Sequence, residues 1–384
     1  MPLILHAIGY AFLALAGIAT LYALTAAVLV ARFMRRPSPT AAAHPPVTLL
    51  KPLSGAEPGL DAALASFAAL KYPAPLQILF GVHSADDPAA LAARNLQAVH
   101  PDLDIDLVVD PRLAGGNRKI SNIINMMAKA RHDVLVLSDS DIAVAPDYLA
   151  QVTAALAQPG VGVVSCLYTG VSAAGFWSRL SAMAVSYQFL PNAVLGAALG
   201  LAQPCFGSTI ALRRETLAAM GGFEAFADLL ADDFEIGRAA RKLGLTISIP
   251  PMAVRHSCTE TSARELIDHE IRWGRTIRLI EGPGYAGSVV TYALPLSLIA
   301  LAFLGPGPAA LAGVGAALAA RLVLKMQVDA STCAKDRHMA GNGWLLPLRD
   351  VLSFVVFLAS FASNSVSWRG RRFRVHPDGV VTHH

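Results

Sequence analysis

Residues 8–31 form an apolar segment without a single charged side chain. At about 1.5 Å per residue, a helix over this segment reaches roughly 36 Å, enough for a hydrocarbon core of about 30 Å. Arg32, Arg35 and Arg36 follow directly, and no basic region precedes the segment, so it lacks the pattern of a cleaved signal peptide. We predict that residues 1–36 are a transmembrane anchor, with the N-terminus outside and residue 32 onward in the cytoplasm.

The overall composition agrees with a membrane protein. Hydrophobic residues make up 54% of the 384 residues and charged residues only 15%. This balance excludes a disordered chain, which needs low hydrophobicity and high charge. The net charge of +4 is weak, and no Lys/Arg-rich stripe is present, so we expect no nucleic-acid partner. No protein partner is indicated either.

Composition also divides the chain along its length. A proline-containing linker leads into a block that holds most of the acidic residues and can bury a full core. Apolar stretches then return at 286–304, 309–327 and 351–368, the second interrupted by Arg321. The predicted regions are an N-terminal anchor (1–36), a linker (37–46), a cytoplasmic domain (47–281), C-terminal transmembrane or re-entrant helices (282–368) and a basic tail (369–384).

These spans conflict with the positive-inside rule. One span before the soluble block and three after it would place the tail outside, whereas the tail arginines favour the inside. Either one C-terminal segment is re-entrant or the charge rule fails.

The soluble block alternates short apolar runs with helical patterns. Alternation of this kind predicts an α/β domain with a mostly parallel sheet flanked by helices. Ligands of such sheets bind beyond the carboxyl ends of the strands. The predicted strands are 47–50, 76–82, 105–109 and 134–137, and the predicted helices are 58–70, 88–98, 119–130 and 147–157.

Polar residues follow several of these strands. Asp86 and Asp87 come after the second strand, where a carboxylate could bind a nucleobase or ribose, although Asp87 before a proline also has the pattern of a helix N-cap. Asp139 and Asp141 follow the fourth strand as D-x-D, a pattern that suits Mg²⁺ bound through carboxylates and phosphates.

Further candidates lie later in the block or on helices. Asp232 and Asp233 either open a helix favourably or form an acidic pair in which repulsion raises one pKa and makes a general base. Arg272 and Trp273 could grip a diphosphate and wall a sugar or lipid site, or belong to a basic face beside the membrane. The segment 117–122 could hold a phosphate or nucleobase or be an ordinary loop. The segment 173–190 reads as a core helix or an interfacial helix that receives a lipid.

Taken in order, these motifs resemble inverting glycosyltransferases of the family 2 type, which have the GT-A fold. The ceramide glucosyltransferase group resembles the chain more closely, and within it the bacterial hopanoid-biosynthesis glycosyltransferases are most similar. One departure is His269, where the wider family has Gln or Arg three residues before the Arg-Trp pair. The motifs that support the resemblance are Leu49–Leu53, Asp86–Pro88, Asn117–Asn122, Ser138–Asp141, Asp232–Asp233, Arg272–Trp273 and Ser367–Arg369, with Asp106–Arg112, Cys166–Gly170, Gly207–Arg214 and His269–Trp273 for the hopanoid group.

This resemblance implies a role for each site residue. Asp87 and Asp139 would hold the uridine of a UDP-sugar, assisted by Lys119 or Asn122. Asp141, with Asp139, would bind Mg²⁺ or Mn²⁺. Asp233, with Asp232 as its acidic neighbour, would accept the proton of the acceptor hydroxyl. Arg272 and Trp273 would close the site near UDP.

The resemblance also implies a reaction and a location. The enzyme would move a sugar, N-acetylglucosamine from UDP-N-acetylglucosamine, to the lipid bacteriohopanetetrol at the bacterial cytoplasmic membrane, with the catalytic domain in the cytoplasm. One alternative is a ceramide glucosyltransferase that makes glucosylceramide, and another is a processive polysaccharide synthase. A transporter or a structural membrane protein is the non-enzyme alternative, but a transporter would place its functional charges within the spans.

Overall fold

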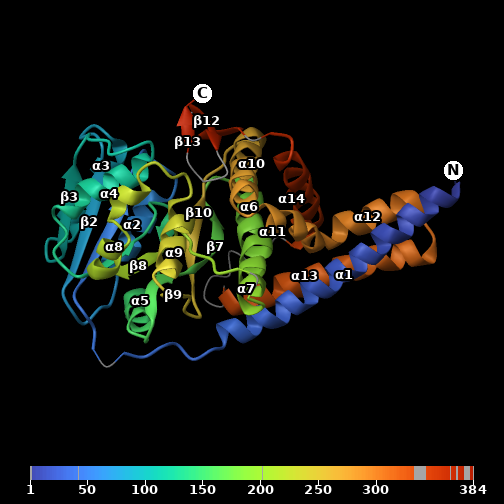
Figure 1. Cartoon of the computed structure of the whole chain (residues 1–384), viewed down its shortest axis with the longest axis horizontal. Helices are drawn as coiled ribbons and strands as arrows, with labels where there is room; N and C mark the ends of the chain where they lie inside the picture. The colour runs from blue at the N-terminus through green and yellow to red at the C-terminus, as the bar shows by residue number, and fades with distance from the viewer. Residues whose placement is uncertain are drawn as a thin grey trace.

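The computed structural model describes residues 2–41, 43–200, 202–332, 343–363, 365–368, 371–375 and 381–383. An α/β body occupies one end of the molecule, and a bundle of apolar helices extends away from it (Figure 1). The N-terminus lies at the far tip of this bundle, and the C-terminal strands lie beside the body.

A seven-stranded sheet with the order β3-β2-β1-β4-β8-β6-β9 forms the centre of the body. Neighbours are parallel from β3 to β4 and between β6 and β9, while β8 is antiparallel to both β4 and β6. The predicted mostly parallel sheet is therefore confirmed, and all four predicted strands lie within it. The strands are β1 (Val47–Pro52), β2 (Leu76–Val82), β3 (Asp104–Val109), β4 (Val134–Leu137), β6 (Val161–Ser165), β8 (Ile210–Arg213) and β9 (Thr246–Ser248).

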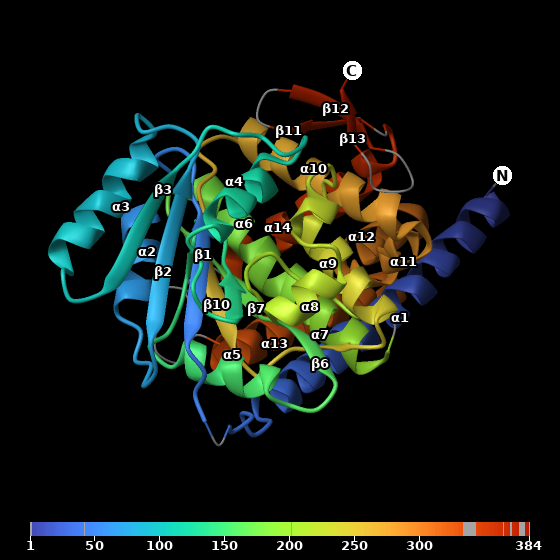
Figure 2. The ribbon, with the colours of Figure 1, turned by 60° about the vertical axis from the view of Figure 1, so that its left-hand side comes forward.

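Helices cover both faces of this sheet, as Figure 2 shows for β1 to β3. Because successive residues of a strand point to opposite faces, Leu49 packs in one hydrophobic core and Leu50 in the other. The four predicted helices are confirmed as α2, α3, α4 and α5, with ends shifted by up to three residues. The first core contains α2 (Leu60–Ala68), α3 (Pro88–Val99) and α5 (Tyr148–Leu156); the second contains α4 (Arg118–Met127), α8 (Arg214–Ala219), η2 (Phe223–Phe226) and α9 (Asp232–Lys242).

A small second sheet begins immediately after the D-x-D sequence. The strand β5 (Ile142–Ala143) pairs antiparallel with β10 (Ala253–Cys258), which pairs parallel with β7 (Leu167–Ser172). A helical segment follows β7 and comprises α6 (Phe176–Ala184), the π-helical turn η1 (Val185–Phe189) and α7 (Leu190–Ala198). The predicted helix over 173–190 is thus confirmed.

The apolar bundle consists of α1 (Pro2–Met34), α12 (Ala293–Leu304) and α13 (Pro308–Thr332), which pack side by side. Glycines allow this close approach, since a Cβ at Gly9 would lie 2.6 Å from Leu304 Cγ and one at Gly313 would lie 2.6 Å from Leu13 Cδ1. Before α12, the chain bends by 67° after α11 (Gly282–Gly287) and η3 (Ser288–Thr291).

Three described helices are long and apolar enough to cross a membrane, or four if the bent pair counts as one span. They are α1, α13 and the helix over Gly343–Ser360, which comprises η5 (Gly343–Leu345) and α14 (Leu346–Ser360).

The predicted apolar stretch 351–368 is wrong at both ends. The helix α14 begins earlier, at Leu346, and its Arg349 and Asp350 are buried in ion pairs. It ends at Ser360, and the alternating residues Ser365–Trp368 form the strand β11. This strand pairs with β12 (Arg371–Val375), which pairs with β13 (Val381–His383), so part of the predicted basic tail is a small sheet. The rest of the tail lies outside the described residues.

One further helix joins the two parts of the molecule. The helix α10 (Ala263–Ile280) follows β10 and contacts α6, α11 and α14. It contains His269, Arg272 and Trp273.

Candidate active site

A buried lysine shapes the turn that contains Asp139 and Asp141. Lys51 is fully buried on β1, and its Nζ donates to the carbonyl oxygens of Asp139 at 2.6 Å and Ile142 at 3.2 Å. Burial lowers the pKa of Lys51 to about 7, against the opposing charges of Asp141 and Asp139. From the sequence we assigned no role to Lys51. A lysine inside a buried strand nevertheless indicates a specific partner, because lysines are rarely buried unless they are paired.

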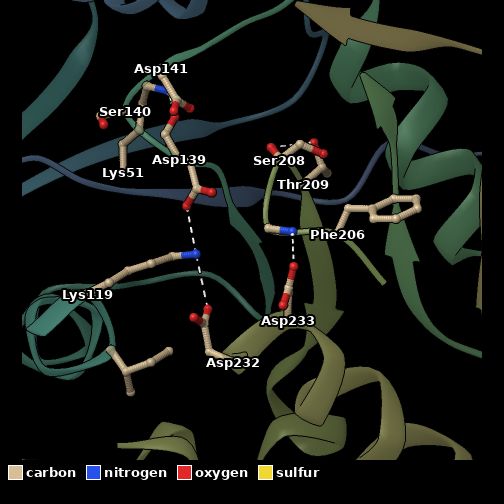
Figure 3. A network of polar contacts seen from close by, with 12 residues as sticks. Lys51, Lys119, Asp139, Ser140, Asp141, Phe206, Ser208, Thr209, Asp232 and Asp233 are labelled. Carbon is tan, nitrogen blue, oxygen red and sulfur yellow. Dashed lines mark hydrogen bonds and ion pairs between the residues drawn. The ribbon is translucent and has the colours of Figure 1, made fainter. Parts of the chain in front are cut away.

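Lys119 joins two of the predicted acidic groups (Figure 3). Its Nζ lies 2.7 Å from Asp139 Oδ1 and 3.1 Å from Asp232 Oδ2. Burial would lower the pKa of Lys119, but the two carboxylates hold it well above its usual value. The lysine therefore stays charged and neutralises part of the acidic site. The structure brings these three predicted residues together from α4, the end of β4 and the start of α9.

Asp233 has a different environment from Asp232. Its Oδ2 accepts from the backbone N–H of Gly207 at 3.0 Å, and its Oδ1 accepts from the N–H of Phe234 at 2.8 Å. Burial and the nearby charge of Asp232 raise the pKa of Asp233 to about 6, although Lys119 opposes the shift. Asp233 is thus a carboxylate that can accept a proton near neutral pH.

Gly207 sits between the acidic groups and was missed as a site residue. A Cβ at this position would lie 2.9 Å from Asp139 Oδ2 and 3.2 Å from Lys119 Nζ. A side chain at this position would have to displace the Asp139 carboxylate or the Lys119 amine, whereas glycine lets the loop donate its N–H to Asp233 without that displacement.

Asp141 faces a histidine that sequence reasoning also missed. His256 of β10 places Nε2 3.2 Å from Asp141 Oδ2. The other oxygen, Asp141 Oδ1, is buried and has no hydrogen-bond partner in the described part of the chain. Because His256 is far away in sequence and has an ordinary strand pattern around it, only the pairing of β5 with β10 reveals it.

These donors fit a divalent cation. A carboxylate with an unpartnered buried oxygen and an imidazole nitrogen are suitable ligands for Mn²⁺, and carboxylates with substrate phosphates suit Mg²⁺. Among the described residues, no group of three or more His, Cys, Asp or Glu side chains forms a complete metal cage. Any ion at this site would therefore need further ligands from substrate or water.

Trp273 of the Arg-Trp pair reaches the same site from α10. The Trp273 ring lies 6.1 Å from that of His256 and 4.4 Å from that of His269, measured between centroids. His269, the departure noted above, places Nδ1 2.6 Å from Glu260 Oε1. Arg272 is partly buried on the same helix.

Two predicted nucleotide-binding residues also have structural partners. Asp87 caps α3, and its Oδ1 accepts from the N–H groups of Ala89 at 2.9 Å and Gly55 at 2.8 Å. Asn122 is buried and donates to the carbonyl oxygen of Gly81 at 2.8 Å. The predicted N-cap is therefore confirmed, and contact of either residue with a nucleotide stays a prediction.

The chain has a GT-A-like fold. A solved mannosyltransferase from Pyrobaculum calidifontis, in complex with GDP-mannose and Mn²⁺, has a similar fold with a TM-score of 0.51 and 22% identity. The match covers 92% of this chain and 99% of that chain.

A model of Glycosyl transferase family 21 matches residues 10–381, and the chain belongs to this family. Ceramide glucosyltransferase 1 of Caenorhabditis elegans is 24% identical over 277 residues, which cover 70% of this chain and 58% of the relative. Ceramide glucosyltransferase 3 of the same organism is 24% identical over 230 residues, with coverage of 60% and 50%. The chain thus spans about half the length of these curated relatives.

Proposed function

We propose that this protein is a membrane-bound inverting glycosyltransferase that transfers a sugar from a UDP-sugar to a lipid hydroxyl. The observation that supports it most is the pair of adjacent carboxylates with different environments. Asp232 is held in an ion pair with Lys119, whereas Asp233 accepts only backbone N–H groups and has a pKa of about 6. Because the two carboxyl groups have different environments, Asp232 can serve in binding while Asp233 serves as an acid or base.

In the proposed reaction Asp233 accepts the proton of the acceptor hydroxyl as its oxygen attacks the anomeric carbon. The bond from that carbon to the UDP oxygen breaks, and its electron pair leaves with UDP. A single displacement inverts the anomeric carbon, so an α-linked donor gives a β-glycoside. Base assistance of this kind contributes about 10²–10⁴-fold to a rate.

The remaining residues bind and orient the donor in this proposal. Asp141 and His256, with Asp139 nearby, would hold Mg²⁺ or Mn²⁺, which neutralises charge on the leaving diphosphate when bound. Lys51 fixes the turn that presents Asp139 and Asp141. Trp273 and Arg272 close the side of the site next to His256.

We propose UDP-N-acetylglucosamine as donor and bacteriohopanetetrol as acceptor, on the motif resemblance to hopanoid-biosynthesis enzymes. The ceramide glucosyltransferase relatives support the alternative pair, UDP-glucose and ceramide. Both pairs share a nucleotide-activated sugar and an amphipathic lipid with a free hydroxyl.

We place the catalytic domain on the cytoplasmic face of the bacterial inner membrane. In this arrangement α1 crosses the membrane, α12 leads outward along it and α13 returns. The helix α14 lies along the membrane surface, because Leu348, Val351, Val355 and Leu358 are exposed on it while Arg349 is buried. This assignment removes the conflict with the positive-inside rule, since the C-terminus stays with the catalytic domain.

Sugar transfer by detergent-purified protein tests the proposal. Labelled UDP-N-acetylglucosamine and UDP-glucose are each offered with bacteriohopanetetrol or ceramide, in Mg²⁺, Mn²⁺ or EDTA. We expect a metal-dependent glycolipid that Asp233→Asn abolishes while leaving UDP binding nearly intact. Glucosylceramide as the only product would replace the proposed donor and acceptor, and a high-mass polymer would favour a polysaccharide synthase. Turnover retained by Asp233→Asn would contradict its role as the base.

A further inference from the structure

Three aromatic rings from separate segments meet beside Asp233. Tyr168 of β7 lies 4.4 Å from Phe189 of η1 and 5.9 Å from Phe206, and the two phenylalanines are 5.0 Å apart, all between centroids. Phe206 directly precedes Gly207, whose N–H binds Asp233. We call these three rings the aromatic triad.

The triad also reaches the other end of the site. The Tyr168 ring lies 5.5 Å from the ring of His256, the partner of Asp141. Tyr168 therefore contacts both Phe206, next to the glycine that binds Asp233, and His256, the partner of Asp141. In the proposed reaction the acceptor hydroxyl meets the anomeric carbon in this region.

The hydroxyl of Tyr168 has no hydrogen-bond partner among the described residues. Four other tyrosines do have one: Tyr22 with Asn192, Tyr72 with the Pro45 carbonyl, Tyr148 with Thr209 and Tyr187 with Asp329. A phenolic hydroxyl is protonated at neutral pH, because its ordinary pKa is about 10. The group is therefore a protonated donor with an unused hydrogen bond inside an acidic site.

The opposite side of the triad connects to the apolar bundle. Phe189 and Phe206 pack against a hydrophobic cluster that includes Ala27 of α1 and Leu324 of α13. The π-helical turn that carries Phe189 is fixed to α13, because Arg321 donates to the Tyr187 carbonyl at 3.0 Å. Turns of this kind are frequent at functional sites.

We propose that the aromatic triad is the acceptor subsite, with the Tyr168 hydroxyl hydrogen-bonded to the acceptor oxygen and the rings packed on the apolar carbons next to it. The ligand class is a lipid alcohol whose apolar part extends toward α1 and α13. This inference rests on the proposed function, since it assigns the acceptor side of the same reaction. Asp233 takes the acceptor proton, and Tyr168 keeps its own.

The test replaces Tyr168 by Phe, which keeps the ring and removes the hydroxyl. Tyr72→Phe is the matched control, because it removes a tyrosine hydroxyl at the linker, remote from the site. Three quantities are measured for each protein in detergent: kcat/KM for the lipid acceptor, UDP affinity by calorimetry, and hydrolysis of the UDP-sugar without acceptor.

We expect Tyr168→Phe to lower kcat/KM for the acceptor about tenfold, the size expected for one lost hydrogen bond. UDP affinity and donor hydrolysis should match the wild type, and Tyr72→Phe should match it in all three measurements. An unchanged kcat/KM for the acceptor in Tyr168→Phe, with active wild type, would overturn the subsite alone. An equal loss of UDP affinity or donor hydrolysis would also overturn it, because the hydroxyl would then act on the donor. Absence of transfer by the wild type would instead overturn the proposed function, and the subsite with it.

Discussion

Asp232 and Asp233 are adjacent on α9 but have different partners. Asp232 forms an ion pair with Lys119, whereas the side chain of Asp233 accepts hydrogen bonds from backbone N–H groups. Because burial and like-charge repulsion raise a carboxyl pKa, the second residue becomes the better base. The sequence predicted the pair, but which member faces the lysine depends on how α4 and α9 pack.

The raised pKa of Asp233 predicts a pH limb in the transfer rate. A base must be ionised to accept a proton, so kcat should fall as the pH drops through about 6, where Asp233 becomes protonated. Above that pH the ionised form predominates, and kcat no longer depends on the ionisation of Asp233. Rate profiles between pH 5 and pH 8 measure it, with UDP affinity followed over the same range to separate binding from chemistry. A rate that stays nearly constant down to pH 5, as an ordinary carboxyl pKa near 4 would give, would be inconsistent with the environment of Asp233.

Replacing Gly207 by alanine should lower the transfer activity. Gly207→Ala would push Asp139 or Lys119 aside, since the added Cβ falls 2.9 Å and 3.2 Å from their side chains. We expect the variant to fold but to transfer sugar at least about tenfold more slowly, because a small misplacement of reacting groups lowers the rate. Gly287→Ala is the control, because nothing described lies within 4 Å of its added Cβ. Equal activity of both variants would show that the loop adapts freely.

Helix α14 is held to the catalytic domain through buried charges. Arg349 makes two hydrogen bonds to Glu270 of α10, at 2.6 Å and 2.7 Å, and Asp350 pairs with Arg321 of α13 at 2.7 Å. Glu270 is three residues before Trp273. The pairs thus fix the helix that presents the Arg-Trp residues to the site.

Removing one partner of the Arg349–Glu270 ion pair should lower the stability of the protein. Arg349→Met leaves Glu270 largely buried without its counter-ion, and we expect about 3–5 kcal/mol of lost stability. The double variant Arg349→Met/Glu270→Gln should recover part of this loss, because no charge is left buried. Thermal unfolding in detergent measures both. A double variant less stable than the single one would mean that the pair is not coupled as the contacts indicate.

Prediction from sequence succeeded where elements have local signals. The strands β1 to β4 are short apolar runs such as Val134–Leu137. The predicted ends of these strands and of the helices α2 to α5 lie within three residues of the observed ends. Prediction from sequence misplaced both ends of α14, whose first turns contain Arg349 and Asp350, buried against partners that are distant in sequence. It also missed Lys51, Gly207 and His256, since the roles of these residues arise from contacts distant in sequence.

At the scale of the whole molecule, the arrangement predicts which sites are accessible from each side of the membrane. In the proposed topology Leu3 at the tip of α1 is outside, whereas Leu91 of α3 and Phe361 after α14 are inside, and all three side chains are exposed. A membrane-impermeant maleimide should label Leu3→Cys in intact spheroplasts and Leu91→Cys or Phe361→Cys only after lysis. The unmutated chain reports labelling of native cysteines. Labelling of Phe361→Cys before lysis would mean that α14 crosses the membrane.

In the proposed reaction Asp233 activates a lipid hydroxyl, which displaces UDP from the sugar in a single step. The anomeric configuration of the glycolipid, read by NMR from the coupling constant of the anomeric proton, distinguishes this mechanism from a two-step one. From an α-linked donor we predict only the β-glycoside, formed by the wild type and lost in Asp233→Asn. An α-glycoside would exclude the single displacement, because it requires retention at the anomeric carbon and therefore another mechanism at this site.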